Sequence, residues 1–297
     1  MIYFTLSNFC FFNKVNNTIY ELSRNKKSML KDPNIMINAQ SGSIPFQCWS
    51  GDINNNVSNG MFYNNILSLQ ENNALNIRFN FANILLEDYD YYDNLGNVAL
   101  QMFNETGASI EISSIPFMEF LQEKYPYYDF VFSKQADIIN PFNKDVLDIL
   151  TQQNNLQLIG LPDRMLFDLP LLKTLSKKNK LELTVDPLCP IDCKEYSNCM
   201  ILEQQNQLKY SGTSVFYNCP KCYLNIIDFP IITIEQIQET YLPLGFNHFT
   251  FSTNYKMDEL SQLIFYIRYF FKPEYWDELV KIGAQSLNGE NANGEKN

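Results

Sequence analysis

Short β-rich runs alternate with helical patterns from about residue 44 onward, and this alternation constrains the fold more than any other feature of the sequence. Such an alternation is typical of a parallel sheet covered by helices. Eight repeats over this length favour a (β/α)8 TIM-barrel-like α/β fold over an open doubly wound sheet. The runs predicted as strands are 44–50, 76–82, 109–114, 128–133, 156–162, 181–186, 224–230 and 247–253.

The chain is expected to form one barrel domain with additions at both ends. Residues 1–43 precede the first predicted strand, and we expect them to form an N-terminal extension with a strand and a short helix that closes one end of the barrel. The barrel is predicted over residues 44–285, with a cysteine-rich insertion at 187–223 after the sixth strand. The tail 286–297 is polar after Leu287 and is predicted to be disordered.

The charge of the chain argues against general nucleic-acid binding. The formal net charge is -11 with 22 Lys and Arg, and no basic run forms a phosphate-tracking patch, so we expect no general nucleic-acid binding. A local basic pocket for a structured RNA stays open. No segment reads as a signal peptide or a membrane helix, which predicts a cytoplasmic protein. In that compartment, clustered cysteines are more often metal ligands or catalytic groups than disulfides.

The predicted strands carry polar residues at the positions that should face into the barrel. Alternate residues of a strand face opposite sides, and the bulky apolar set should pack against the helices. The interior of a barrel is usually filled by branched apolar side chains, so this polar set is unusual. The residues predicted to point inward are Arg78, Asn80, Glu111, Ser133, Glu182, Thr184, Asp186, His248, Thr250 and Ser252.

Buried charges of this kind need a partner, because an unpaired one is strongly destabilising. One interpretation is a structural ion pair between Arg78 and either Glu111 or Glu182. The other is a ligand-binding interior, and the two are compatible. As ligand-binding candidates we take Arg78, Asn80, Glu111, Ser133 and His248, and as catalytic acid or base candidates Glu182 and Asp186.

Five of the seven cysteines gather in one segment after the strand predicted at 181–186. Thiolates two to five residues apart in a loop can converge on one metal, either an iron–sulfur cluster or a structural zinc. Free structural cysteines or an adventitious disulfide are the alternative. The candidate metal ligands are Cys189, Cys193, Cys199, Cys219 and Cys222. Cys10 is expected to pack in the core, and Cys48 either to pack there or to add a further metal ligand, with packing favoured.

His248 is the only histidine, which excludes mechanisms that need two imidazoles. No G-x-S-x-G elbow, H-E-x-x-H helix or P-loop is present. Ser-His-Asp hydrolysis is therefore not expected. Cys-His chemistry stays open, although no cysteine is singled out for it.

Several stretches together resemble the collagenase-like peptidase family, whose relatives include bacterial iron–sulfur proteins that act in ubiquinone and RNA hydroxylation. These stretches are "LELTVDPLC", "ITIEQIQETYLPLGFNHFTFSTN" and "YFFKPEYWDEL". The resemblance covers roughly residues 44–280 and implies a TIM-like barrel. It also implies a [4Fe-4S] cluster on Cys189 and three of Cys193, Cys199, Cys219 and Cys222.

The chain departs from the family pattern in its final strand. The family usually has Lys, Glu and Arg where this chain has Thr250, Ser252 and Asn254, and the cysteine spacing is tighter here. The resemblance therefore implies a divergent member that has kept the barrel and the cluster with a changed reaction.

We hypothesise a barrel with a [4Fe-4S] cluster that performs redox or hydroxylation chemistry on a small molecule, a nucleotide or a peptide. One alternative is a non-enzymatic barrel with a structural zinc that binds a protein partner. Another is a peptidase, as the family name implies.

Overall fold

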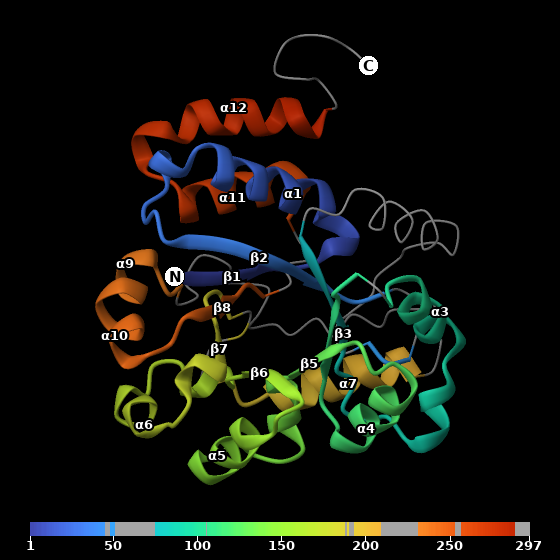
Figure 1. Cartoon of the computed structure of the whole chain (residues 1–297). Helices are drawn as coiled ribbons and strands as arrows, with labels where there is room; N and C mark the ends of the chain where they lie inside the picture. The colour runs from blue at the N-terminus through green and yellow to red at the C-terminus, as the bar shows by residue number, and fades with distance from the viewer. Residues whose placement is uncertain are drawn as a thin grey trace.

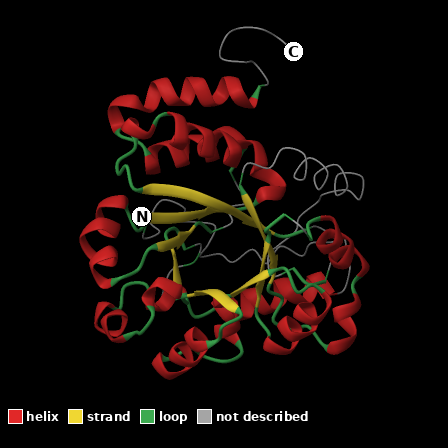
Figure 2. Ribbon diagram, in the orientation of Figure 1, coloured by secondary structure: helices red, strands yellow, loops and turns green. Residues whose placement is uncertain are grey.

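In the part of the chain that the computed structural model describes, eight parallel strands close into one barrel (Figure 2). The described residues are 1–44, 48–50, 75–104, 106–187, 189, 193–208, 231–252 and 257–288. The predicted (β/α)8 fold is confirmed. The strands are β1 (Ile2–Leu6), β2 (Ile35–Gly42), β3 (Asn76–Phe81), β4 (Ser109–Ile112), β5 (Asp129–Phe132), β6 (Leu156–Gly160), β7 (Leu181–Thr184) and β8 (His248–Thr250).

Helices lie outside the barrel between successive strands (Figure 1). Those with long apolar faces pack together, and α1 lies against both α11 and α12 beside β1 and β2. None of the described helices is both long and apolar enough to span a bilayer. The helices are α1 (Phe9–Asn25), α3 (Asn94–Met102), α4 (Ile115–Lys124), α5 (Lys144–Gln152), α6 (Leu169–Thr174), α7 (Tyr196–Leu208), α9 (Ile234–Gln236), α10 (Leu242–Leu244), α11 (Glu259–Phe270) and α12 (Trp276–Leu287).

Side-chain caps fix where several of these helices begin. The residue before the first helical residue accepts a hydrogen bond from a backbone N–H of the first turn, which satisfies a donor that has no partner inside the helix. Each cap therefore fixes the residue at which its helix begins. The capping residues are Asp93 for α3, Ser114 for α4, Asn143 for α5, Asp168 for α6 and Asp258 for α11.

The N-terminal residues are part of the barrel, which corrects the predicted extension 1–43. Residues 2–6 form β1, which pairs with β2 on one side and β8 on the other. Residues 35–42 form β2, which pairs with β3. In β2 the apolar alternation ends after Ile37 and gives way to small and polar residues, so the sequence pattern does not mark it. The barrel domain therefore begins at residue 2.

The strand predicted at 44–50 is wrong. Ile44 lies in coil, and Cys48 and Trp49 form a turn beyond the end of β2. The strand predicted at 224–230 lies outside the described residues, and β7 pairs directly with β8. The cysteine-rich segment consequently follows the seventh barrel strand, whereas the sequence analysis placed it after the sixth.

At the C-terminus, helix α12 continues to Leu287, which is two residues into the predicted tail. The tail from residue 289 lies outside the described residues.

Aromatic side chains fill the layer between the barrel and α11. Phe4 and Phe249 lie on neighbouring strands with ring centroids 5.6 Å apart, and Phe4 meets Phe270 of α11 edge-on. Phe251 contacts Tyr266 in the same way. Burial of such rings stabilises the fold by roughly 1.5–3 kcal/mol each. Because these residues face outward, the alternate residues of β1, β7 and β8 must face the barrel axis.

Candidate active site in the barrel interior

Residues of β7, β8 and β1 form rows across the barrel interior. The strand register aligns Glu182 with His248 and Tyr3 in one row, and Thr184 with Thr250 and Thr5 in the next. A third row lies just past the strand ends, where Asp186, Ser252 and Ser7 are joined through hydrogen bonds to Ser252. The inward orientation that the sequence predicted for β7 and β8 is the one observed.

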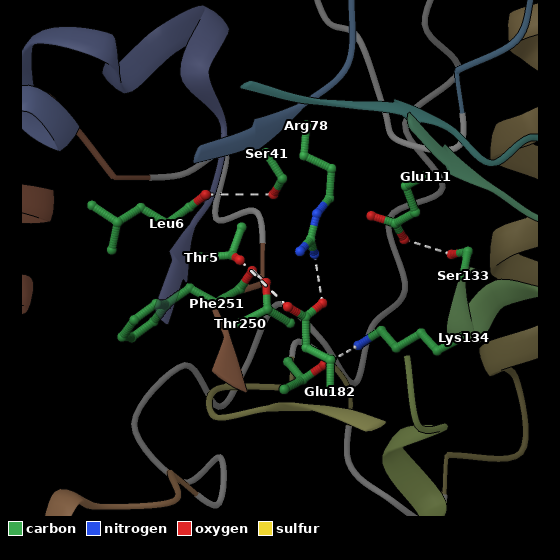
Figure 3. A network of polar contacts seen from close by, with 11 residues as sticks. Thr5, Leu6, Ser41, Arg78, Glu111, Ser133, Lys134, Glu182, Thr250 and Phe251 are labelled. Atoms are coloured by element: carbon green, nitrogen blue, oxygen red, sulfur yellow. Dashed lines mark hydrogen bonds and ion pairs between the residues drawn. The ribbon is translucent and has the colours of Figure 1, made fainter. Parts of the chain in front are cut away.

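Arg78 and Glu182 form an ion pair across the barrel (Figure 3). Arg78 Nη1 donates to Glu182 Oε2 at 2.6 Å, and the residues are only 3% and 4% exposed. Thr5 donates a second hydrogen bond to Glu182. Burial acts to lower the pKa of Arg78, but the charge and hydrogen bond of Glu182 together with the charge of Glu111 outweigh it, and the net pKa is raised. Of the two acceptors left open by the sequence, Glu182 is the partner.

Glu111 of β4 lies beside this pair without joining it. Ser133, just after β5, donates its hydroxyl to Glu111 Oε1 at 2.7 Å (Figure 3). Burial raises the pKa of Glu111, although the charge of Arg78 acts in the opposite direction. Asn80 turns to the backbone, because its side-chain oxygen accepts a hydrogen bond from the N–H of Ala82.

Lys134 belongs to the site but was not among the residues predicted from the sequence. Its Nζ donates to Asp163 Oδ1 at 2.7 Å and to Thr184 Oγ1 at 2.8 Å, so it connects the carboxyl ends of β5, β6 and β7. The Lys134 side chain is 22% exposed. Its position directly after the strand predicted at 128–133 was the available signal, because barrel enzymes place site residues at the carboxyl ends of strands.

Asp186 lies two residues past the end of β7 and is held by the neighbouring strand segment. The backbone N–H of Ser252 donates to Asp186 Oδ1 at 2.6 Å. Burial raises the pKa of Asp186 well above its ordinary value, while Lys134 acts to lower it. Lys134 also acts on Glu111 in the same direction. One ammonium group therefore stands within electrostatic reach of two carboxyl groups that hold their protons more tightly than usual.

His248 lies at the amino end of β8, away from Asp186. Its ring stacks on Tyr3 with centroids 4.9 Å apart and an interplanar angle of 15°. Burial lowers the pKa of His248, although Glu182 acts in the opposite direction. His248 therefore lies in the same row as Glu182, stacked on Tyr3 and away from the carboxyl end of the barrel.

The candidate metal ligands are only partly within the described residues. Cys189 and Cys193 are half-buried and Cys199, on α7, is buried, whereas Cys219 and Cys222 lie outside the described residues. No group of three or more potential metal ligands occurs among the residues that the structure describes. The predicted five-cysteine cluster thus stays a prediction.

The other two cysteines contact backbone carbonyls near the barrel. The Cys10 thiol donates to the carbonyl of Ser43 at 2.9 Å, and burial raises its pKa. Cys48 is buried, and its thiol lies 3.5 Å from the carbonyl of Asp90. Both positions fit the expected packing role.

Helix α7 lies inside the cysteine-rich segment and contacts loops that follow β3 and β5. Gln204 is fully buried and donates to Gln135 Oε1 at 2.8 Å, while its own side-chain oxygen accepts from the N–H of Ile84 at 2.6 Å. Gln135 directly follows Lys134, and Ile84 lies in the loop after β3. The segment that leaves β7 therefore reaches the loops after β3 and β5.

No protein-family model matches this chain, and no curated protein or solved structure matches it either.

Proposed function

We propose that this protein is a barrel enzyme that transfers protons to and from a small polar substrate bound at the carboxyl ends of β4, β5 and β7. The observation that supports the proposal most directly is that Asp186, a buried carboxyl group of raised pKa held by the Ser252 N–H, lies within electrostatic reach of the cation Lys134. General acids and bases work best when their pKa lies near the working pH. Perturbed carboxyl groups at the carboxyl end of a barrel are typical of catalytic sites.

The residues divide into chemical roles. Asp186 is the acid or base, because Ser252 fixes one of its oxygens and so orients the carboxyl group. Lys134 stabilises negative charge that develops on the substrate, as a fixed cation in a site of low dielectric does. Glu182 was also predicted as an acid or base. Because Arg78 and Thr5 engage it, we assign it to holding Arg78.

Replacing Asp186 with asparagine is expected to slow proton transfer by about 10²–10⁴-fold, the usual contribution of a general acid or base. The wild-type protein would be incubated in D₂O with small hydroxy, keto and amino acids, and NMR would record deuterium uptake or product formation. Asp277→Asn changes an exposed carboxyl on α12 and should leave the rate unchanged. An Asp186→Asn protein with the wild-type rate would contradict the assignment of Asp186 as the acid or base. A wild-type protein that acts on no compound of the series would also contradict it.

The pH dependence of stability provides a control for the folding of the Asp186→Asn variant. A carboxyl whose pKa is raised in the folded state supports folding below its unfolded pKa, and that support is lost as the pH rises through the folded pKa. Asp186→Asn removes this loss and keeps an acceptor for Ser252. Urea unfolding should therefore show the variant gaining stability relative to wild type as the pH rises from acidic to neutral.

The cysteine-rich segment favours a second function, and we propose that it holds a metal centre, with a [4Fe-4S] cluster as the first choice and zinc as the alternative. Cys189 stands three residues beyond Asp186, so its thiol belongs to the same end of the barrel as the proposed site. A cluster bound there would supply one-electron chemistry for a redox or hydroxylation reaction on a small molecule, a nucleotide or a peptide.

Anaerobic purification distinguishes the metals. A brown protein that absorbs near about 400 nm and contains iron and sulfide is the expected result for a thiolate-bound cluster. The double variant Cys189→Ala/Cys193→Ala should lose the colour. The control variant Cys10→Ala, which changes a cysteine on α1 outside the cysteine-rich segment, should keep it. Stoichiometric zinc in a colourless protein would favour the zinc alternative, in which the metal holds the segment and the barrel binds a protein partner. A folded protein without either metal would contradict both.

A further inference from the structure

The guanidinium of Arg78 is only partly used by the protein. Nη1 meets Glu182, whereas Nε is buried and has no hydrogen-bond partner among the described residues. Buried N–H groups almost always have a partner, and leaving one without a partner is costly when the group is charged. Arg78 is 3% exposed, so bulk water does not serve this donor. The Nε edge of the guanidinium is therefore an available donor inside the barrel.

Lys134 also has an N–H donor without a partner in the part of the chain that the structure describes. An ammonium group carries three N–H donors, and the contacts with Asp163 and Thr184 use two of them. The side chain is partly exposed, unlike that of Arg78. In Figure 3 the Arg78 side chain points down toward Glu182, the Lys134 side chain approaches from the right, and Glu111 lies above Lys134. The charges of Arg78 and Lys134 both act on the carboxyl group of Glu111.

The charges here also limit the kind of ligand. Each cation already has a carboxylate partner, Glu182 for Arg78 and Asp163 for Lys134. A doubly charged phosphate would meet those carboxylates at close range, and like charges repel strongly in a low dielectric. A single carboxylate adds less repulsion and matches the planar geometry of a guanidinium edge.

We propose that the barrel binds a small carboxylic acid as its anion, with the carboxylate on the Nε edge of Arg78 and the remainder of the molecule reaching toward Lys134. The proposal rests on the proposed function, because it names the substrate class of the same site. Arg78 is then a binding residue as well as the partner of Glu182. Lys134 binds the oxygen on which negative charge develops.

Arginine side-chain NMR gives a direct test, because the chain has four arginines, Arg24, Arg78, Arg164 and Arg268. The Nε–H signal of Arg78 is identified by its loss in Arg78→Lys, which keeps a cation for Glu182. Acetate, pyruvate and succinate at up to about 10 mM, enough to detect a Kd of about 1 mM, should move the Arg78 signal. Arg164 is the internal control, because its Nε already donates to Asp137 and should not move.

Lys134→Met should weaken binding of the acid that shifts Arg78 by about tenfold or more, the size of one hydrogen bond to a charged group. Lys144→Met, which changes an exposed lysine on α5, should leave binding unchanged. The proposal is overturned if none of the three acids moves the Arg78 signal, if acetamide moves it as strongly as acetate, or if inorganic phosphate binds more tightly than the acids.

Failure of this inference is distinguishable from failure of the proposed function. If the acids do not reach Arg78 while Asp186→Asn still abolishes turnover of some compound, the ligand class is wrong and the proton-transfer role stands. If the acids bind at Arg78 but no compound is turned over, the binding site stands and the catalytic role of Asp186 is wrong.

Discussion

Replacing Arg78 with methionine is expected to lower the free energy of unfolding by about 3–5 kcal/mol, because it leaves the carboxylate of Glu182 buried without its cation. Among the described residues, Thr5 would then be the one side chain left donating to that carboxylate, at 3.3 Å. Urea denaturation of the wild type and the variant measures the difference. Arg78→Lys should lose less, since it keeps a positive charge near Glu182.

The matched controls separate loss of the pair from loss of packing. The double variant Arg78→Met/Glu182→Leu removes both charges and should recover most of the stability, because replacing a buried pair by apolar groups is often neutral. Lys144→Met breaks an exposed ion pair with Asp148 and should change stability little. An Arg78→Met protein as stable as the wild type would mean that the ion pair is not needed for folding.

Replacing Trp49 with alanine is expected to destabilise the protein by a similar amount, about 3–5 kcal/mol, as large-to-small changes of buried aromatic residues do. Trp49 is fully buried, and its ring meets Phe81 at 5.1 Å and Phe117 at 5.2 Å between centroids. Its indole N–H donates to the carbonyl of Asp90 at 2.7 Å, a bond that alanine cannot make. Chemical unfolding followed by circular dichroism gives the measurement.

Gly96 provides an independent check on the same contact. A Cβ at position 96 would lie 2.3 Å from Cε3 of Trp49, so Gly96→Ala should destabilise the wild type through overpacking, by about 1–3 kcal/mol. In a Trp49→Ala background the indole is gone and that penalty should vanish. If Gly96→Ala costs the same in both backgrounds, helix α3 does not pack on Trp49 as described.

The sequence predicts the barrel well where bulky apolar residues alternate. The strands β3 to β8 fall within predicted runs because residues such as Phe79, Leu183 and Phe249 face the helices at every second position. The strand β2 has no such alternation after Ile37, so it was missed. The run at 44–50 is equally rich in apolar residues, but it packs Trp49 against α3 from a turn. Local pattern cannot distinguish a buried strand from a buried turn.

The polar interior was predictable because alternation also fixes what faces inward. Arg78 and Glu182 were expected to face the barrel axis, and the ion pair follows from burial of two opposite charges. The choice of Glu182 over Glu111 was not predictable, since it depends on distances across the barrel. Lys134 was missed because it lies one residue past the predicted strand, and only the closed ring of strands brings it to Asp163 and Thr184.

The barrel closes where the first strand pairs with the last, and this pairing limits the order in which the strands can assemble. The strand β1 lies between β2 and β8, so residues 2–6 must wait for residues 248–250 before both of their edges are paired. Contacts so distant in sequence form slowly, because a long loop must be closed before they are gained. Until that seam closes, the open edges of β1 and β7 can pair with other chains, so slow closure carries a risk of aggregation.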